Sequence, residues 1–514
     1  MESGRPKKTL TEFKVEKNKF MAEIKEDLVQ SRIREAKNMD IDELREEIKN
    51  IYNEIGMGKL AKYITALFLQ RDQNIITDFR TDNIQVYDND REYFKNIGSE
   101  MIKALLTELI KTHNTRNTSE EVLHLIRTQT YKYDEERFKA APLNLIPLAN
   151  GVYDLNTDEL LPNDPKYLFD IQIPVNYNQK NECPAIEKFI GEIIDEEEKL
   201  IIYDIFGLLL YRKNFLEKFF IFNGEGQNGK SKLIELMQKF IGEENSSSIT
   251  LKQLTDDRFA VARTCKKLLN VGADISGAPI TDTSILKSAS ASDKISGQFK
   301  FGQIFDFTPS ATEVFSANKP PIFYDDSVGM FRRAELITFR HLFGNVKDME
   351  ENLKCKKADP QILDKLTTSE ELSGLLNIAL KHLKLILSTG QLSIVKSAKE
   401  LRTNYIKASN SVQAFCETCC EEAEYIPADK EKGNSENIPA QGFLTVFDLY
   451  KAYSLYCKDQ NINIKTKDGF SKIMRKLSEW NLEFSQQDSK TGIVADKTRS
   501  VRGIKFKVGC EYAI

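Results

Sequence analysis

The chain has 514 residues, enough for about three or four domains of ordinary size. Hydrophobic residues make up 41% and charged residues 29%, which excludes a disordered or collagen-like chain. The formal net charge of −4, from 73 Lys and Arg against 77 Asp and Glu, excludes a histone-like polycation but allows local basic surfaces.

The N-terminal region, residues 1–75, is densely charged, and its apolar residues recur at helical spacing from Phe20 to Ile55. It has no apolar core typical of a secretory signal, and the chain has no run approaching 18 apolar residues. We therefore expect no membrane partner and a cytoplasmic protein, in the host cell if the gene is viral. Residues 7–14 resemble a degenerate sliding-clamp-binding peptide through Leu10 and Phe13; a frayed tail is the alternative.

The next region, residues 76–200, mixes helices with short strands such as Ile84–Tyr87 and Gly151–Leu155. Residues 201–345 alternate strands and helices, as an α/β nucleotide-binding core does. We expect a helical segment at 346–420, a polar linker at 421–442 and a small last domain at 443–514.

A glycine-rich loop is the most specific motif of the chain. Gly224-Glu-Gly-Gln-Asn-Gly-Lys-Ser231 fits G-x-x-x-x-G-K-[ST], after an apolar run (Phe219–Phe222) and before apolar residues at helical spacing. Strand, glycine loop and helix is the arrangement that lets backbone N–H groups and a helix N-terminus face phosphates. The candidate nucleotide-binding residues are Gly224, Glu225, Gly226, Gln227, Asn228, Gly229, Lys230, Ser231 and Lys232.

The loop predicts a site for ATP with Mg²⁺. Lys230 would neutralise phosphate charge, and the Ser231 hydroxyl would ligate the metal. An acidic residue should end a later buried strand, and Asp274 does so 44 residues after Lys230. We predict that Asp274 is the second metal-associated group; capping of the following turn is the alternative.

Two further polar positions follow strand-like runs. Asn318 ends the run Ala311–Ala317, where it could hydrogen-bond a γ-phosphate or the attacking water; otherwise it is a turn residue. Arg332 and Arg333 precede an apolar strand. One of them could stabilise transition-state charge at a neighbouring subunit's γ-phosphate, or the pair could be solvated or partly structural. We therefore count Lys230, Asp274, Asn318, Arg332 and Arg333 as candidate catalytic residues.

The C-terminal part carries a Cys-x-x-Cys pair and a basic surplus. Cys416 and Cys419 lack a second zinc-binding pair, and Ser411–Glu422 favours a buried helix with reduced thiols. Residues 441–514 hold 13 Lys and Arg against 8 Asp and Glu, a net charge of +5. Two predicted helices (Val446–Cys457 and Lys467–Glu479) and strand-like pieces around Asp488–Lys497 suggest a winged helix. Its candidate DNA-binding residues are Lys472, Arg475 and Lys476; a solvated helix face is the alternative.

The order and spacing of these motifs resemble those of superfamily 3 helicases, in the branch of phage, plasmid and poxvirus-type primase-helicases. Similar segments include Asp257–Arg263, Leu286–Ile295 and Ser316–Arg333, and outside the core Leu148–Leu155 and Glu370–Leu380. The resemblance covers about residues 80–507.

This resemblance implies an α/β fold: an AAA+-like P-loop ATPase core, with a flanking α+β N-terminal domain, a helical segment and a C-terminal winged helix. It implies a homo-hexameric ring that translocates 3′ to 5′ on single-stranded DNA and unwinds forked duplex. In that ring Asn318 would be the sensor residue that contacts the γ-phosphate. Arg332 or Arg333 would be the arginine finger that acts on the ATP of a neighbouring subunit. Lys300 would sit near a DNA-contacting hairpin; a solvated strand residue is the alternative.

The sequence departs from the family's pattern where Ala273 stands before Asp274, since many relatives carry two adjacent acids, and where Ala291 and Ser292 replace a glycine-rich pair. Only 60–80 residues precede the matched region, so we expect no primer synthesis by this chain. The competing hypothesis is an origin-binding initiator ring in which ATP controls assembly, and Ala273 favours it. A small-molecule kinase would leave Asn318, the paired arginines and the winged helix unexplained.

Overall fold

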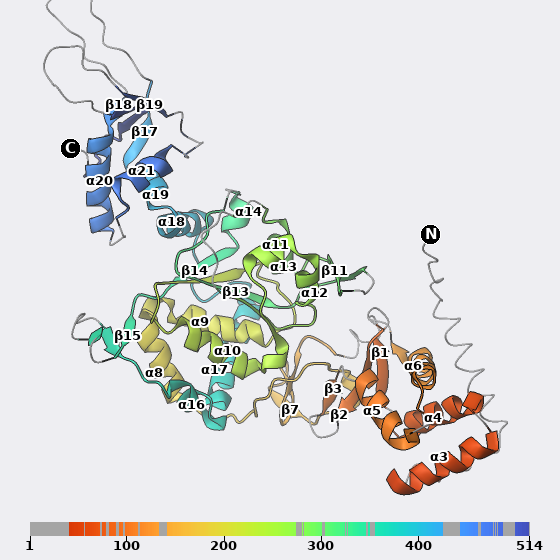
Figure 1. Cartoon of the computed structure of the whole chain (residues 1–514). Coiled ribbons are helices and arrows are strands. Elements are labelled where there is room, and N and C mark those ends of the chain that lie inside the picture. Colours follow the sequence, from red (N-terminus) through yellow and green to blue (C-terminus); the bar gives the residue numbers. More distant parts are fainter. Residues whose placement is uncertain are drawn as a thin grey trace, which may run out of the picture.

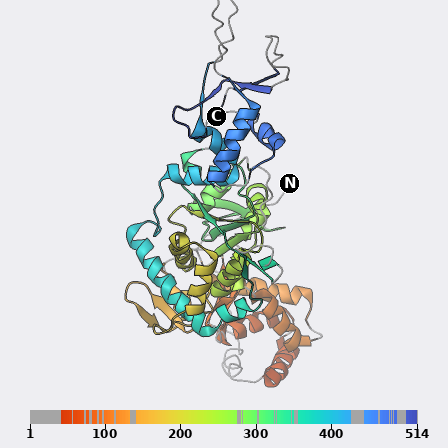
Figure 2. The same cartoon turned by 90° about the vertical axis from the view of Figure 1, so that its left-hand side faces the viewer.

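The computed structural model of the chain has three parts placed in a row, and two perpendicular views show this arrangement (Figures 1 and 2). The structure describes residues 41–55, 57–71, 74–78, 82–88, 92–95, 98–111, 114–132, 141–273, 280, 282–300, 304–323, 325, 327–345, 348–349, 355–424, 443–460, 464–475, 477, 480, 482–486 and 499–512. The central part lies between the N-terminal and C-terminal parts.

Within its described residues, the N-terminal part packs four helices around a small sheet. The helices are α3 (Ile41–Ile55), α4 (Met57–Arg71), α5 (Gly98–Ile110) and α6 (Arg116–Thr130). The sheet has the order β3-β2-β1-β4, with β1 (Ile75–Asp78), β2 (Ile84–Asp88), β3 (Tyr93–Lys95) and β4 (Tyr131–Lys132). Apolar residues of all four helices and of β1 and β2 form one buried cluster, so this part has its own core.

A three-stranded antiparallel sheet joins the N-terminal part to the central part. It contains β5 (Leu145–Leu148), β6 (Gly151–Asp154) and β7 (Glu159–Leu161), followed by the 3-10 turn η2 (Pro165–Tyr167). Two helices then lead into the central sheet: α8 (Pro184–Ile193) and α9 (Glu196–Leu209).

The central sheet has five strands in the order β14-β8-β13-β10-β9, and every neighbouring pair is parallel. The strands are β8 (Phe219–Asn223), β9 (Ser246–Ser247), β10 (Leu269–Gly272), β13 (Thr312–Ala317) and β14 (Ala334–Thr338). Their nearly continuous burial is typical of a parallel sheet covered on both faces. The expected strands of the α/β core are thus confirmed.

Helices and a hairpin surround this sheet. The helices are α10 (Lys230–Ile241), η3 (Glu243–Asn245), α11 (Leu251–Asp256), α12 (Arg258–Ala262), α13 (Ser284–Ser290) and α14 (Val328–Phe331). The antiparallel hairpin pairs β11 (Ile295–Gln298) with β12 (Ile304–Phe307). Beyond β14, β15 (Leu342–Gly344) pairs with β16 (Cys355–Lys357) in parallel.

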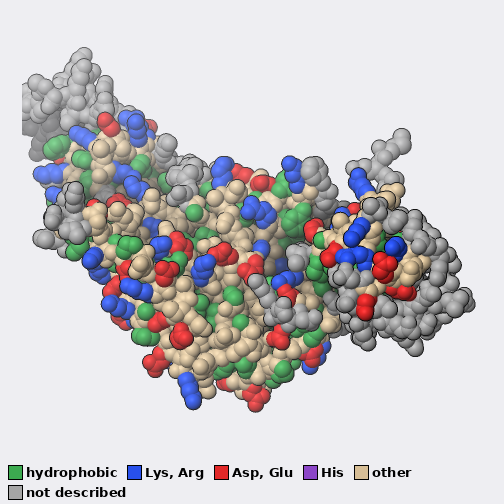
Figure 3. Space-filling model, turned by 60° about the horizontal axis from the view of Figure 1, so that its bottom comes forward, with side chains coloured by type: hydrophobic (Ala, Val, Ile, Leu, Met, Phe, Trp, Pro, Cys, Tyr) green, Lys and Arg blue, Asp and Glu red, His purple; other side chains and the backbone are tan. Residues whose placement is uncertain are grey.

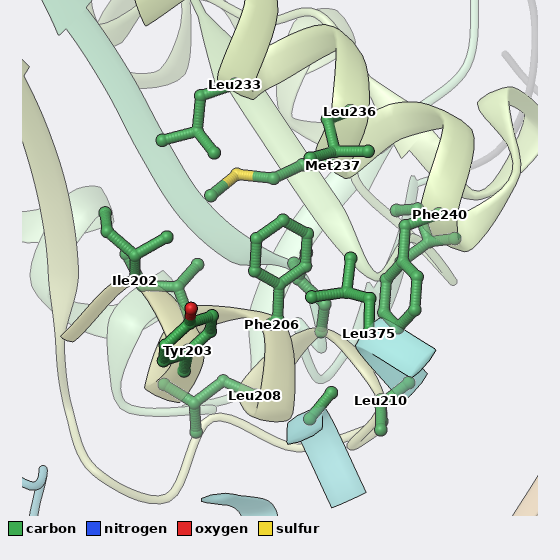
Figure 4. Close-up of a cluster of buried hydrophobic side chains, with 14 of the residues drawn as sticks. Ile202, Tyr203, Phe206, Leu208, Leu210, Leu233, Leu236, Met237, Phe240 and Leu375 are labelled. Carbon is green, nitrogen blue, oxygen red and sulfur yellow. The ribbon is translucent and has the colours of Figure 1, made fainter. Parts of the chain in front are cut away.

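The main core lies where α9, α10 and α17 (Ser369–Thr389) meet the sheet. Figure 4 shows Phe206 of α9 among Met237 and Phe240 of α10 and Leu375 of α17. All four side chains are completely buried. The amphipathic spacing of α10 places Leu233, Ile234, Met237, Phe240 and Ile241 on this buried face, as the sequence predicts.

The predicted helical segment contains α16 (Ile362–Leu366), α17 and α18 (Ala398–Ser409). The Thr368 side chain caps α17 and Gly390 ends it at a φ of 68°. Ser397 and Glu400 form a capping box at the start of α18, which explains why that helix begins there.

The C-terminal part contains α19 (Ser411–Cys419), α20 (Val446–Asp459) and α21 (Lys467–Met474). Its strands are β17 (Cys420–Glu422), β18 (Phe443–Thr445), β19 (Glu483–Gln486), β20 (Arg499–Arg502) and β21 (Ile504–Phe506). They form the sheet β18-β20-β19 and the pair β17-β21. One buried cluster combines side chains of α19, α20 and α21 with β20 and β21, and Phe470 and Trp480 belong to it or pack on it.

The helix predicted to run to Glu422 ends at Cys419. The next three residues form β17 instead, because their backbone pairs antiparallel with β21. The predicted linker 421–442 therefore joins two strands of one packed unit. Cys416 and Cys419 are buried thiols of α19, and all eight cysteines are outside disulfides.

A three-residue ion cluster connects the parts. The Lys266 ammonium lies 2.5 Å from an Asp78 carboxylate oxygen of β1 and 3.0 Å from one of Asp170. Asp78 is only 2% exposed. Because a buried carboxylate needs a partner, Lys266 of the central part holds β1 against it.

Candidate nucleotide-binding site

The glycine-rich loop lies between the end of β8 and the start of α10, in the strand–loop–helix order that the sequence predicts. Its backbone is held on both sides: the Gly224 N–H donates to the Ala317 carbonyl at 3.2 Å, and the Phe343 N–H donates to the Gln227 carbonyl at 2.7 Å. The loop is therefore supported by β13 and by the segment that follows β14.

Two glycines are required by this shape. Gly229 has a φ of 87°, and a Cβ built there would lie 2.5 Å from Ile193 Cγ2. A Cβ on Gly224 would lie 2.7 Å from the Phe339 carbonyl oxygen. Both contacts are shorter than a side chain tolerates, so the motif's glycines permit a close approach of the loop to α8 and to the end of β14.

Lys230 is the buried cation of the loop, with only 5% of its surface exposed. Its ammonium donates to the carbonyls of Gly224 and, at 3.3 Å, of Glu225, and to Asn228 Oδ1 at 3.1 Å. Asn228 is also buried, and its Nδ2 donates to the Phe339 carbonyl at 3.4 Å. The lysine thus has only uncharged oxygen partners among these bonds, which phosphate oxygens could replace.

The remaining loop residues differ in accessibility. Glu225, Gly226, Gln227 and Ser231 are exposed. The Lys232 ammonium lies 2.8 Å from Glu235 Oε2, one helical turn further along α10. The hydroxyl of Ser231 is therefore accessible at the helix start, whereas Lys232 has a partner on its own helix.

The sensor candidate Asn318 directly follows β13, and its side chain is exposed. β13 lies between β8 and β10, as predicted for a strand that places a polar group between the loop and the acidic strand. Since parallel strands end at the same edge of a sheet, Asn318 lies at the edge that carries the glycine loop. β10 ends at Gly272 in this sheet, and Asp274 lies outside the described residues.

The arginine candidates lie at the opposite ends of the strands from the glycine-rich loop. Arg332 and Arg333 precede β14, whose first residue, Ala334, pairs with Phe219, the first residue of β8. The loop starts after the last residue of β8, so the five-residue strand separates the arginines from it by about 16 Å. Both arginines form ion pairs with Glu217.

The DNA-binding candidates occupy two other places. Lys300 is exposed two residues after β11, on the β11–β12 hairpin. Lys472 and Arg475 are exposed at α21 and directly after it, and Lys476 lies outside the described residues. On the face shown in Figure 3, basic and acidic side chains are interspersed over the body of the molecule.

The end of β14 and the residues after it lie beside the loop, as the contacts of Phe339 and Phe343 show, but reasoning from the sequence did not identify their polar groups. His341 Nε2 lies 3.1 Å from Asp195 Oδ1, and Arg340 pairs with the same carboxylate. The Thr338 N–H donates to Glu198 Oε2 at 3.4 Å, and burial raises the pKa of Glu198 above its ordinary value. The sequence contained a usable signal for these residues, because a strand that pairs in parallel with β8 must also end beside the loop.

Family comparisons match two stretches of the chain. Residues 7–195 match the family described as "D5 N terminal like". Residues 222–333, which contain the glycine loop, Asn318 and both arginines, match a family described as being of unknown function (DUF5906).

One curated relative is a protein of Acanthamoeba polyphaga mimivirus named "Putative helicase". The sequences are 24% identical over an alignment of 262 residues, and the match covers 47% of this chain. The match covers 27% of the viral protein, so the chain spans about a quarter of that relative's length. Together with the first family match, this relative supports a relationship to D5-like helicases.

Solved structures with distant likeness include the A-form apo structure of the NrS-1 C-terminal region. It is 12% identical, with a TM-score of 0.42, over 84% of this chain and 95% of that chain. A second structure of the NrS-1 C-terminal region has a TM-score of 0.40 and 12% identity, over 84% and 96% of the two chains. No helix in the described part of the chain is both long and apolar enough to cross a membrane.

Proposed function

We propose that the protein is an ATP-dependent replicative DNA helicase of a virus, plasmid or integrated element. The family match and the viral relative suggest a helicase- or primase-helicase-type replication protein. The observation that carries the proposal is the glycine loop and Asn318 at one edge of a parallel sheet, with the buried Lys230 inside the loop.

ATP would bind at the loop, with its phosphates facing Lys230 and the start of α10. The accessible Ser231 hydroxyl is a hard oxygen donor suited to Mg²⁺, and Asp274 would be the second group holding the ion. Bound Mg²⁺ would neutralise charge on the phosphates. Asn318 would hydrogen-bond the γ-phosphate or orient the attacking water.

A homo-hexameric ring would complete each site. Arg332 and Arg333 lie about 16 Å along the sheet from the loop of their own chain. In addition to Lys230, an arginine that stabilises the transition state would therefore come from a neighbouring copy, in a head-to-tail interface that closes into a ring.

DNA would be contacted by Lys300 in the ring's pore and by Lys472, Arg475 and Lys476 on the C-terminal part. The two helices α20 and α21 followed by β19 and β20 support a winged-helix role for this part. Residues 7–14, the candidate clamp-binding segment, lie outside the described residues. Single-stranded and forked DNA remain the proposed partners, and the host cytoplasm the proposed location if the gene is viral.

The test is ATP hydrolysis and unwinding of a forked duplex by the purified chain. We expect Lys230→Ala to abolish both activities, because no other side chain of the loop is a buried cation. Lys239→Ala is the matched control: this lysine lies on the same helix, is half exposed, and its ammonium lies 2.7 Å from Glu243 Oε1. A wild-type protein that neither hydrolyses ATP nor unwinds DNA would refute the proposal.

The second candidate function is an origin-binding initiator ring whose assembly ATP controls. Ala273 favours it, because the sequence lacks a second acid beside Asp274 to orient water. ATP-dependent ring formation with negligible turnover on DNA would select this alternative over the helicase.

A further inference from the structure

The two arginines converge on one carboxylate oxygen. Arg333 Nη2 lies 2.8 Å from Glu217 Oε2, and Arg332 Nη2 contacts the same oxygen. Glu217 lies in the connection between α9 and β8, more than 110 residues before the arginines. A single acid thus neutralises part of the charge of both candidate finger residues.

The arginines differ in how firmly they are held. The Arg333 side chain is 12% exposed, and its Nη1 also donates to the Gly329 carbonyl at 2.6 Å. The Arg332 side chain is 51% exposed. Because Arg333 has two anchors and little contact with water, it is the fixed member of the pair, and Arg332 is the member that can move.

The backbone holds Glu217 in an unfavourable conformation. Its φ is 54°, in the left-handed region that a residue with a Cβ seldom adopts. The connection cannot easily relax, because the Asn214 side chain donates to the carbonyls of Ala289 at 3.0 Å and Ala311 at 2.7 Å. Two residues after Glu217, the Phe219 N–H donates to the Arg333 carbonyl at 2.9 Å. Strain of this kind persists where surrounding structure requires the position.

We propose that Glu217 is a positioning residue that gives the two arginines different roles. It fixes Arg333 as a structural support. It also retains Arg332, the side chain that reaches the phosphates of a neighbouring subunit, until that site is assembled. This inference rests on the proposed ATPase function. When Arg332 leaves Glu217, it exchanges a carboxylate for phosphate oxygens, so its charge stays compensated, and Glu217 keeps Arg333 as its partner.

The first test compares Arg332→Ala with Arg333→Lys in the full-length protein. Arg332→Ala should lower kcat for ATP at least 100-fold, as expected for loss of an arginine finger. Its KM for ATP and its thermal unfolding temperature should stay near the wild-type values. Arg333→Lys should show the opposite pattern, a clearly lower unfolding temperature with a much smaller loss of kcat, since a lysine cannot form both contacts of Arg333.

Mixing inactive subunits tests whether Arg332 acts in trans. Lys230→Ala subunits have an intact arginine, and Arg332→Ala subunits have an intact loop. An equal mixture should recover about a quarter of the wild-type rate, the share of head-to-tail interfaces that pair the two intact halves. Mixtures that stay inactive, although both variants co-assemble, would overturn the assignment.

Glu217→Gln tests the positioning role itself. It removes the charge that retains Arg332 but keeps an oxygen for Arg333. We expect about a two- to five-fold higher ATPase rate at low protein concentration and no change at saturating protein concentration. The free energy of an exposed ion pair corresponds to about this ratio between the released and the retained Arg332 side chain.

The outcomes separate this inference from the proposed function. A wild-type protein without ATPase activity refutes the proposed function, and the assignment of Arg332 with it. An active wild type whose Arg332→Ala variant keeps more than a third of kcat refutes the assignment alone. An unchanged concentration dependence in Glu217→Gln would show that this carboxylate does not hold Arg332.

Discussion

Glu313 lies inside the central sheet on β13 and is completely buried. The Asn270 side chain donates to its Oε2 at 2.7 Å, while Oε1 has no hydrogen-bond partner among the described residues. Burial raises the pKa of the Glu313 carboxyl from 4.5 to about 8. At neutral pH the folded protein therefore keeps this group protonated.

Replacing it by glutamine should change how stability depends on pH. Between pH 4.5 and 8 the unfolded chain loses the Glu313 proton and the folded chain keeps it. Each pH unit in this interval lowers the free energy of unfolding by about 1.4 kcal/mol, about 5 kcal/mol in all. Glu313→Gln mimics the protonated form, so it should match the wild type near pH 4.5 and exceed it by several kcal/mol at pH 8.

The assay is urea unfolding of both proteins at half-unit steps from pH 5 to 8, followed by the transition that reports the central sheet. The difference between the proteins isolates Glu313, because all other titrations cancel. Glu335→Gln is the matched control: Glu335 is 1% exposed on β14, but ammonium groups of Lys396 and Lys218 lie 2.8 and 3.4 Å from it. That variant should be destabilised by about 1–3 kcal/mol, since it leaves two cations facing an amide. A constant difference between wild type and Glu313→Gln across the pH range would show that Glu313 is ionised in the folded protein.

Three shorter predictions concern close contacts. Gly229→Ala should raise the KM for ATP at least about tenfold, because the φ of 87° disfavours alanine and the new Cβ would lie 2.5 Å from Ile193 Cγ2. Gly226→Ala should have a smaller effect, because a Cβ at Gly226 would have no atom within 4 Å. Gly374→Ala should lower stability by about 1–3 kcal/mol in urea unfolding, because its Cβ would overlap the backbone of Glu182; Gly191→Ala, which meets only the end of Lys199 at 3.9 Å, should not. Lys266→Met should leave the buried Asp78 without this partner and lower the free energy of unfolding by about 1–3 kcal/mol. It should also speed protease cleavage between residues 78 and 141, and unchanged cleavage would contradict the proposed link between the N-terminal and central parts.

Local patterns predicted the site's framework. The buried run Phe219–Phe222, the glycines and the apolar spacing after Lys230 are properties of short segments, and β8 and α10 follow them closely. The position of Asn318 was also predictable, because parallel βα units place strand ends at one edge.

Contacts between distant segments were not predictable from such patterns. Glu217 looks like any loop acid in the sequence, and only the pairing of β8 with β14 brings it to Arg332 and Arg333. The end of α19 at Cys419 depends on a partner strand more than 80 residues later. The neutrality of Glu313 likewise depends on burial by the whole sheet.

The junction between α18 and α19 limits how the C-terminal part can move. A single residue, Asn410, separates the two helices, and Arg402 of α18 lies 3.0 Å from Glu417 of α19. Tyr405 of α18 is buried, its hydroxyl donates to the Pro321 carbonyl at 2.8 Å, and its ring packs on Phe331 at the end of α14. The helix α14, which precedes Arg332, is therefore connected to the C-terminal part through the packed helices α18 and α19, so a displacement of α14 would move the C-terminal part with it.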